Sequence, residues 1–267
     1  MEILAKDAPA DNMVCYYRDD EIMRSRSLGA FVPTRTLAVP TPPARLLADW
    51  SRESDFEPGD VESLSLPRAR RHWPDYRDCV HAVSDWATSL GLHGVLDDAD
   101  IALMACRGAR YHHDGLQYGG AAFCNLFLTG DKELDLHFPG TGQRIALVAG
   151  TAVIFDTAQP HAVIDRRAAG FDAADFPAGS DRSLVFLTWE LPLDAGVARA
   201  LRIDLDVAPA RALAIDDEQI HRDDARVEVC AASGRWLPAP GIGEYPDAAA
   251  GGMKASPPSI SRSTEPT

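Results

Sequence analysis

The amino-acid sequence predicts a mainly β protein, in which two facing sheets close into a barrel and helices flank one outer face. Between about residues 99 and 191, short runs rich in Val, Ile, Leu, Phe and Thr are separated by Gly, Asp and Pro turns, as is typical of antiparallel strands. Helical periodicity precedes this region and does not recur between the runs, which disfavours a parallel α/β sheet. With 267 residues, of which 46% are hydrophobic and 25% charged, the chain is long enough to bury such a core.

Two amphipathic helices are predicted ahead of the barrel, after residues 1–40, which show no clear period. The first helix spans about residues 43–53, where Pro43 suits an early helical position and the apolar residues fall on one face. The second begins near Trp73 and ends before Gly91, with apolar residues every three or four positions. Their apolar faces are expected to pack on the barrel.

Eight strands are expected in the barrel region. They are placed near residues 100–106, 109–114, 121–128, 133–138, 144–148, 151–156, 160–166 and 183–191. After the barrel, residues 196–224 show no decisive pattern. Residues 226–237 are expected to form a hairpin that turns at Ser233 and Gly234.

The composition along the chain predicts one domain and a tail. Residues 1–240 are expected to form a single domain, with an N-terminal helical region and a core at about 99–191. Residues 241–267 are rich in Ala, Gly, Ser and Pro, so we expect them to be a flexible tail.

The charge balance disfavours nucleic acid as a partner. There are 26 basic and 40 acidic residues, and the formal net charge of −14 repels a phosphate backbone. The dense basic cluster at Arg68, Arg70 and Arg71 has two interpretations, a contact with a polyanion or a solvated linker. A small-molecule partner is therefore favoured.

Cysteine usage and hydropathy indicate the compartment. The five cysteines include no C-x-x-C pair and no zinc-finger spacing, so they are expected to be reduced thiols. No run of residues approaches the 18 or so apolar residues of a membrane span, and the first residues lack the order of a secretion signal. We therefore expect a cytoplasmic protein with no membrane contact.

The candidate metal ligands are His112, Asp114 and His161. In a strand, side chains two positions apart point to the same face, so His112 and Asp114 are expected to aim at one point. His161 follows His112 by 49 positions, on another predicted strand. Two imidazoles and one carboxylate on one face of an ion leave adjacent positions open, which is typical of non-haem Fe(II) oxygenases. His113 is expected to point to the opposite face.

These motifs resemble the Fe(II)/2-oxoglutarate-dependent dioxygenase superfamily, in its prolyl-hydroxylase-like and alkylation-repair-like branches. The resemblance covers roughly residues 105 to 191. It includes the H-x-D pair, the run from Gly150 to Asp156, the segment Pro160 to Val163 and a last strand that begins at Arg182. It implies a double-stranded β-helix (jelly-roll), cupin-like barrel that holds Fe(II), takes 2-oxoglutarate as co-substrate and uses O₂.

The resemblance also implies residues that bind 2-oxoglutarate. A basic residue early in the last strand binds the distal carboxylate in that family, and Arg182 occupies this place. It follows His161 by 21 residues, because an apparent inserted loop precedes it. Arg167, which shares the strand face of His161, is the competing candidate. Asn125 and Thr188 are the expected polar neighbours of the co-substrate.

The implied reaction is hydroxylation or oxidative demethylation of a C–H bond in a small-molecule or amino-acid-like substrate, with release of succinate and CO₂. Because Asp114 supplies a carboxylate, the halide position of halogenating relatives is absent. Two alternatives remain open: a cupin-type metalloprotein that does not use 2-oxoglutarate, and a non-enzymatic β binding module. Cupins usually carry H-x-H followed by a glutamate, which the segment RYHHDGLQYGG does not offer.

Overall fold

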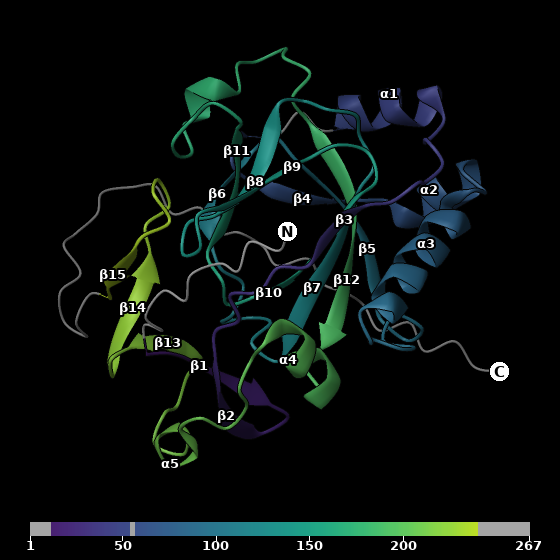
Figure 1. The fold of residues 1–267 in the computed structure, drawn as a ribbon. Coiled ribbons are helices and arrows are strands. Elements are labelled where there is room, and N and C mark those ends of the chain that lie inside the picture. Colours follow the sequence, from purple (N-terminus) through teal and green to yellow (C-terminus); the bar gives the residue numbers. More distant parts are fainter. Residues whose placement is uncertain (1–11, 54–56, 240–267) are drawn as a thin grey trace, which may run out of the picture.

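The predicted barrel is present in the computed structural model of this chain, which describes residues 12–53 and 57–239. A six-stranded and a four-stranded sheet form the barrel, and a five-stranded sheet lies beside it (Figure 1). All pairs of strands in these sheets are antiparallel, as the short runs and tight turns of the sequence predict.

The two barrel sheets are built from strands that follow one another closely in the sequence. In spatial order, the six-stranded sheet contains β3 (Thr34–Thr36), β10 (Thr151–Asp156), β7 (Ala121–Phe127), β12 (Leu184–Pro192), β5 (Ile101–Cys106) and β4 (Val61–Leu64). The four-stranded sheet contains β6 (Ala109–His112), β11 (His161–Asp165), β8 (Leu134–Phe138) and β9 (Gln143–Ala146). From β5 to β12 the chain passes repeatedly between the two sheets, which is the double-stranded β-helix arrangement that the sequence predicts.

The interior of the barrel is filled by apolar side chains from both sheets. Phe127, Phe155 and Phe186 come from the six-stranded sheet, and Leu136 and Phe138 come from the four-stranded sheet. Large aromatic side chains of this kind supply much of the hydrophobic stabilisation of a small barrel. This part of the barrel interior is therefore a packed core.

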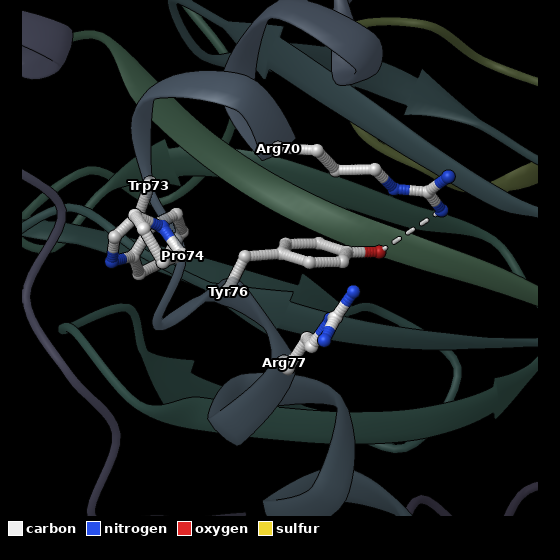
Figure 2. Close-up of a pocket in the computed structure, with 5 residues that line it drawn as sticks. All are labelled: Arg70, Trp73, Pro74, Tyr76 and Arg77. Carbon is white, nitrogen blue, oxygen red and sulfur yellow. Dashed lines mark hydrogen bonds between the residues drawn. The ribbon is translucent and has the colours of Figure 1, made fainter.

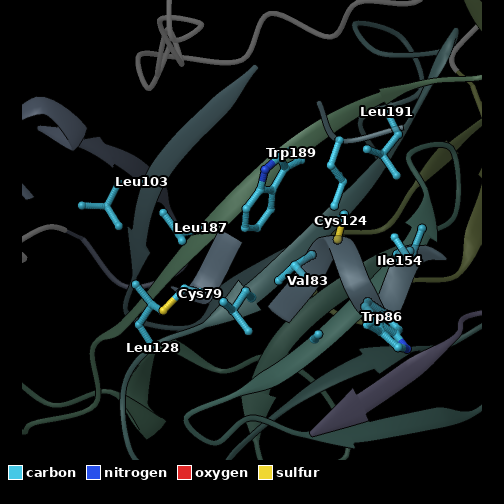
Figure 3. Packing of buried hydrophobic residues seen from close by; sticks show 14 of the residues in the cluster. Cys79, Val83, Trp86, Leu103, Cys124, Leu128, Ile154, Leu187, Trp189 and Leu191 are labelled. Atoms are coloured by element: carbon cyan, nitrogen blue, oxygen red, sulfur yellow. The ribbon is translucent and has the colours of Figure 1, made fainter. Parts of the chain in front are cut away.

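Helices cover the outer face of the six-stranded sheet. They are α1 (Ala44–Glu53), α2 (Leu66–His72) and α3 (Tyr76–Ser89). Cys79, Val83 and Trp86 of α3 pack against sheet residues that include Leu187 and Trp189 (Figure 3). The two predicted helices are confirmed, and their apolar stripes form part of the core.

The third sheet combines the two ends of the described chain. Its order is β15 (Trp236–Pro238), β14 (Ala225–Val229), β13 (Gln219–Arg222), β1 (Met13–Asp19) and β2 (Ile22–Ser27). The hairpin predicted at residues 226–237 is confirmed, because β14 and β15 pair and Gly234 in the turn has a φ of +69°. The strands near the N-terminus lie in a region where the sequence shows no period.

The basic cluster of the sequence lies in a helix rather than in a linker. Arg68 of α2 forms ion pairs with Asp49 and Glu53 of α1, so this part of the cluster joins two helices. The ambiguous region 196–224 contains α4 (Ala195–Leu201), α5 (Pro209–Ala212) and β13.

Three expectations are not tested by the fold. The predicted tail, residues 241–267, lies outside the described residues, and the single-domain boundary stays a prediction. Within residues 12–53 and 57–239, no helix is long and apolar enough to cross a lipid bilayer. The cytoplasmic location stays a prediction.

Candidate metal centre

Adjacent strands of the four-stranded sheet bring the two predicted histidines together. His112 ends β6, His161 begins β11, and the two residues are direct partners in the antiparallel register. The register slips by one residue before the next pair, Val163 with Ala109. An extra residue in β6 therefore allows both Ala109 and His112 to face the barrel interior.

Asp114 lies in the turn after β6, which corrects part of the sequence argument. Asp114 is expected on the strand near residues 109–114, where alternation would align it with His112. The strand β6 ends at His112 instead. The turn positions the carboxylate instead: the Asp114 N–H donates to the Thr157 carbonyl at 2.7 Å, and the Tyr118 N–H donates to the Asp114 carbonyl at 2.7 Å. Gly115 lies against Ala158, where an added side-chain carbon would approach within 2.8 Å.

The three side chains converge on one point. One ligand atom from each of His112, Asp114 and His161 lies within 4.8 Å of the others. The distance from His112 Nε2 to Asp114 Oδ2 is 3.8 Å, and that from His161 Nε2 to the same oxygen is 3.6 Å. These residues could hold a metal ion, because two imidazole nitrogens and a carboxylate oxygen form a common donor set for first-row metals.

Both histidines are oriented by hydrogen bonds to nearby backbone. His112 Nδ1 contacts the Arg110 carbonyl at 2.7 Å, and His161 Nδ1 contacts the Gln159 carbonyl at 3.0 Å. Because a carbonyl only accepts, the proton of each neutral imidazole lies on Nδ1, and the lone pair lies on Nε2. Both lone pairs are therefore on the nitrogens that face Asp114.

Burial keeps the imidazole of His161 neutral. Burial is the main cause that lowers the pKa of His161 to about 4, and the neighbouring His112 acts in the same direction. Phe155 and Phe138 cover the ring, with ring centroids at 4.8 Å and 6.1 Å from that of His161. A neutral imidazole is the form that binds metal.

A buried ion pair holds the segment that leads to His161. Asp156 ends β10, and its carboxylate accepts hydrogen bonds from both terminal nitrogens of Arg26, from the Gly29 N–H and from the Ala158 N–H. Both charged side chains have zero exposure. Sequence analysis missed this pair, since Arg26 lies in the region without a clear period and 130 residues from its partner.

The predicted polar neighbours Asn125 and Thr188 face each other across β7 and β12. Asn125 is 8% exposed, and its Oδ1 is buried with no hydrogen-bond partner among the described residues. The neighbouring positions on the same face, Phe127 and Phe186, belong to the interior core. Asn125 and Thr188 are therefore polar residues on the interior wall of the barrel.

Arg182 lies just before β12 and has partners at the end of β11 and in the inserted loop. Its Nη2 donates to Asp165 Oδ2 at 2.5 Å, and its Nη1 donates to the Asp175 carbonyl at 2.9 Å. The guanidinium also lies over the ring of Phe176, 5.8 Å from its centroid. The competing candidate, Arg167, is 80% exposed and contacts Glu133. The assignment of Arg182 to the co-substrate stays a prediction.

The other residues near the motif have structural contacts. His113 is not among the three converging residues and packs on Trp236 of the hairpin, with ring centroids 5.4 Å apart. Burial lowers the pKa of His113 to about 4. His137 Nδ1 contacts the Tyr111 hydroxyl at 2.5 Å. Cys106 and Cys124 are buried thiols, as expected.

A pocket of about 460 Å³ lies at the junction of α2 and α3, apart from the barrel strands that carry the three ligands. Its lining residues are Arg70, Trp73, Pro74, Tyr76 and Arg77 (Figure 2). Arg70 Nη2 donates to the Tyr76 hydroxyl at 3.4 Å, and its guanidinium lies over the same ring. Arg70 of the basic cluster therefore has a structural contact with Tyr76.

Comparison with known proteins gives likenesses to solved structures only. No family model and no curated protein matches the chain. The viral collagen prolyl hydroxylase vCPH from Paramecium bursaria Chlorella virus-1, as a 2OG complex, is 8% identical over 62% of this chain and 97% of that chain, with a TM-score of 0.40. A prolyl-4-hydroxylase from Pseudomonas putida is 18% identical over 60% of this chain and 92% of that chain, with a TM-score of 0.36.

A third likeness is to the polyketide cyclase RemF from Streptomyces resistomycificus. It is 14% identical over 36% of this chain and 55% of that chain, with a TM-score of 0.24. The matched region thus spans about half the length of RemF. The assignment of the barrel here depends on the strand order and the register described above.

Proposed function

We propose that this protein is a non-haem Fe(II)- and 2-oxoglutarate-dependent oxygenase. The proposed reaction hydroxylates or oxidatively demethylates a C–H bond of a small-molecule or amino-acid-like substrate, and releases succinate and CO₂. The observation that carries the proposal is the convergence of two imidazole nitrogens and one carboxylate oxygen within 4.8 Å. The proposed iron ligands are His112, Asp114 and His161.

The chemistry of the donor set supports Fe(II). Two neutral imidazoles and one carboxylate, without a thiolate, suit a redox-active divalent ion and leave coordination positions for other molecules. The hydrogen bonds from the two Nδ1 atoms to carbonyls fix the direction of both Nε2 lone pairs. The buried thiols Cys106 and Cys124 have raised pKa values, to about 12 for Cys106, because burial disfavours thiolate.

The interior wall supports 2-oxoglutarate as the co-substrate. Asn125 has an unpartnered polar atom, and Thr188 lies directly opposite it in the sheet. Arg182 would supply the positive charge for the distal carboxylate, and for this its contact with Asp165 would be exchanged for the co-substrate. When bound, Fe(II) and 2-oxoglutarate together activate O₂ for the oxidation of a C–H bond.

The residues of the chain would act by placement and by exclusion of water. His112, Asp114 and His161 would fix the ion, and the aromatic rings of Phe138 and Phe155 keep water from one side of His161. A C–H bond reacts only if it is held close to the oxidising centre, so the side chains around the ion would decide which bond reacts. No side chain is required as a general acid or base in this scheme.

Calorimetric titration tests the proposal. Mn(II), which is inert to turnover, is titrated into the protein, and 2-oxoglutarate is then titrated with and without Mn(II). The oxygenase requires that Mn(II) binds and that 2-oxoglutarate binds at least tenfold more tightly when Mn(II) is present. Equal binding of 2-oxoglutarate in both titrations contradicts the proposal.

A cupin-type metalloprotein without 2-oxoglutarate is the second candidate. It is favoured by one observation, that the guanidinium of Arg182 already has an acidic partner in Asp165. In the same titrations this candidate requires Mn(II) binding alone. A non-enzymatic binding module requires neither.

A further inference from the structure

The interior face of β12 becomes polar toward the metal centre. Along this face, Leu184 and Phe186 are buried and apolar, whereas Thr188 and Glu190 are polar and partly exposed. Glu190 pairs with Phe123 of β7 in the register. The ring of Phe123 contacts Phe155, at 6.1 Å between centroids, and Phe155 contacts the metal-site residue His161 at 4.8 Å. Glu190 therefore lies on the wall that leads to the candidate metal centre.

The polar side chains of this wall have no side-chain partners among residues 12–53 and 57–239. Glu190, Thr188 and Asn125 form no side-chain hydrogen bond or ion pair with any residue in the described ranges. Asn125 is 8% exposed, and its Oδ1 is a buried acceptor that lacks a donor. A buried polar atom without a partner is costly. Asn125 and Thr188 are assigned above to the co-substrate, so Glu190 is the polar group of this wall that remains without a ligand.

The charges around Glu190 are negative. The Glu190 N–H donates to the Asp100 carbonyl at 3.4 Å, so the two acidic residues are neighbours. Burial and the charge of Asp100 raise the pKa of Glu190, and no positive group contributes to that shift. Two arginines of the barrel region are paired with acids elsewhere, Arg166 with Asp131 and Arg182 with Asp165. A cation is therefore the complement that this part of the wall lacks.

Aromatic residues neighbour Glu190 on the same wall, since Phe123 is its partner in the register. Tyr118 packs edge-on against Phe123 at 5.0 Å between centroids, and Gln117 Nε2 donates to the Tyr118 hydroxyl at 3.1 Å. The Tyr118 N–H donates to the backbone carbonyl of Asp114 at 2.7 Å, so Tyr118 lies between this wall and the candidate metal centre. Aromatic faces beside a carboxylate are a favourable setting for an organic ammonium group.

We propose that the molecule oxidised at this centre carries a protonated amine, which Glu190 binds through its carboxylate while Phe123 and Tyr118 contact the adjoining carbon chain. The oxidative part of this proposal rests on the proposed function, but the cation site does not. Glu190 would bind the ammonium end and so hold a carbon beyond it near the ion at His112, Asp114 and His161. The acidic net charge of the protein, −14, also favours the approach of cations.

The test compares three probes of similar shape and different charge. Benzylammonium, benzyl alcohol and benzoate are titrated calorimetrically into the full-length protein loaded with Mn(II) and 2-oxoglutarate. The variants are Glu190→Gln, which keeps the shape and removes the charge, and the matched control Glu62→Gln. Glu62 of β4 is exposed and pairs with Ala105, a residue of the outer core, so it lies on the opposite face of the sheet.

We expect wild-type protein and Glu62→Gln to bind benzylammonium at least tenfold more tightly than benzyl alcohol. In Glu190→Gln this ratio should fall to about one, with the affinity for benzyl alcohol changed by less than about twofold. No preference in the wild type, or a preference that persists in Glu190→Gln, overturns the proposal. Circular dichroism of Glu190→Gln establishes that the variant is folded.

The same titrations separate this proposal from the oxygenase proposal. If 2-oxoglutarate fails to bind, the probes are titrated into the protein with Mn(II) alone. A preference for benzylammonium that depends on Glu190 then supports the cation site and removes the oxygenase reaction. Binding of 2-oxoglutarate without any preference among the probes leaves the oxygenase and overturns the cation site.

Discussion

At the scale of single residues, the two histidines of the candidate metal centre are oriented by the same local contact. In each case the Nδ1–H donates a hydrogen bond to the backbone carbonyl two positions earlier, that of Arg110 for His112 and of Gln159 for His161. Each strand thus fixes its own imidazole before any ion binds. The two imidazoles are therefore already ordered in the folded protein, so metal binding loses little side-chain entropy. This favours a high affinity for the metal.

Removal of a ligand should abolish the reaction and leave the fold in place. Asp114→Ala and His161→Ala each remove one donor, so we expect succinate formation that depends on iron to fall at least about a hundredfold. His81→Ala is the matched control, because His81 is an exposed histidine on α3. Full turnover by either ligand variant, measured as succinate release under saturating 2-oxoglutarate, would show that the ligand assignment is wrong.

Arg182 and Arg167 differ in their surroundings, and this difference gives a test of the co-substrate site. Arg182→Ala should raise the 2-oxoglutarate concentration needed for half-maximal binding to the Mn(II)-loaded protein by about tenfold or more, since a charge-assisted pair is lost. Arg167→Ala should leave it unchanged, because this side chain is 80% exposed and contacts Glu133. The reverse pattern in calorimetry would transfer the role to Arg167.

At the scale of elements, the buried pair of Arg26 and Asp156 joins β2 to the end of β10. Asp156 also accepts the N–H of Ala158, in the turn that leads to His161. A change in Arg26 is therefore expected to affect both the stability of the protein and the position of His161, a proposed metal ligand. The pair connects the five-stranded sheet to the barrel.

Arg26→Met should strongly destabilise the protein. It leaves the carboxylate of Asp156 buried without its partner, and breaking a buried pair in this way costs about 3–5 kcal/mol. We expect this loss in the free energy of unfolding by urea, together with weaker Mn(II) binding. Arg18→Ala is the control, because the Arg18–Glu218 pair is partly exposed, and here little change is expected. Equal losses in the two variants would contradict the role given to Asp156.

The elements differ in how well the sequence predicts them. The barrel strands and the hairpin at Ser233 and Gly234 follow apolar runs and turn residues, and these signals are local. β2 has no such signal, because its buried positions include Ser25 and Arg26, both with zero exposure. A pattern argument assigns polar residues to the surface, so a strand that buries an arginine through a distant aspartate is missed.

The site shows the same limit. The residue types and spacing predicted that His112, Asp114 and His161 converge, as they do, but alternation along a strand is not what aligns them. A one-residue slip in β6 and a turn held by Thr157 place His112 and Asp114 together. Bulges and turn contacts depend on the partner strand, so their effect is not visible in a single segment of sequence.

At the scale of the whole molecule, both ends of the described chain contact β6 or the turn after it, which carry His112 and Asp114. In the five-stranded sheet, Cys15 Sγ contacts the Gly115 carbonyl at 3.8 Å, and the side chain of Tyr17 lies beside Gly119. On the other side, the Tyr111 N–H donates to the Ala231 carbonyl at 3.0 Å. The centre is thus surrounded by segments that are far apart in the sequence, and it should form only when the whole fold forms.

This dependence predicts that metal binding stabilises the entire protein. An ion that binds the folded state and not the unfolded chain adds about 2.7 kcal/mol to the free energy of unfolding when its free concentration is 100 times its dissociation constant. We therefore expect Mn(II) to raise the thermal midpoint of the wild-type protein by several degrees. A single transition should be seen by far-UV circular dichroism and by tryptophan fluorescence. Because Asp114→Ala lacks a ligand, its midpoint should not respond to Mn(II), whereas that of His81→Ala should rise as in the wild type. A rise of the same size in Asp114→Ala would mean that the ion binds elsewhere on this acidic surface.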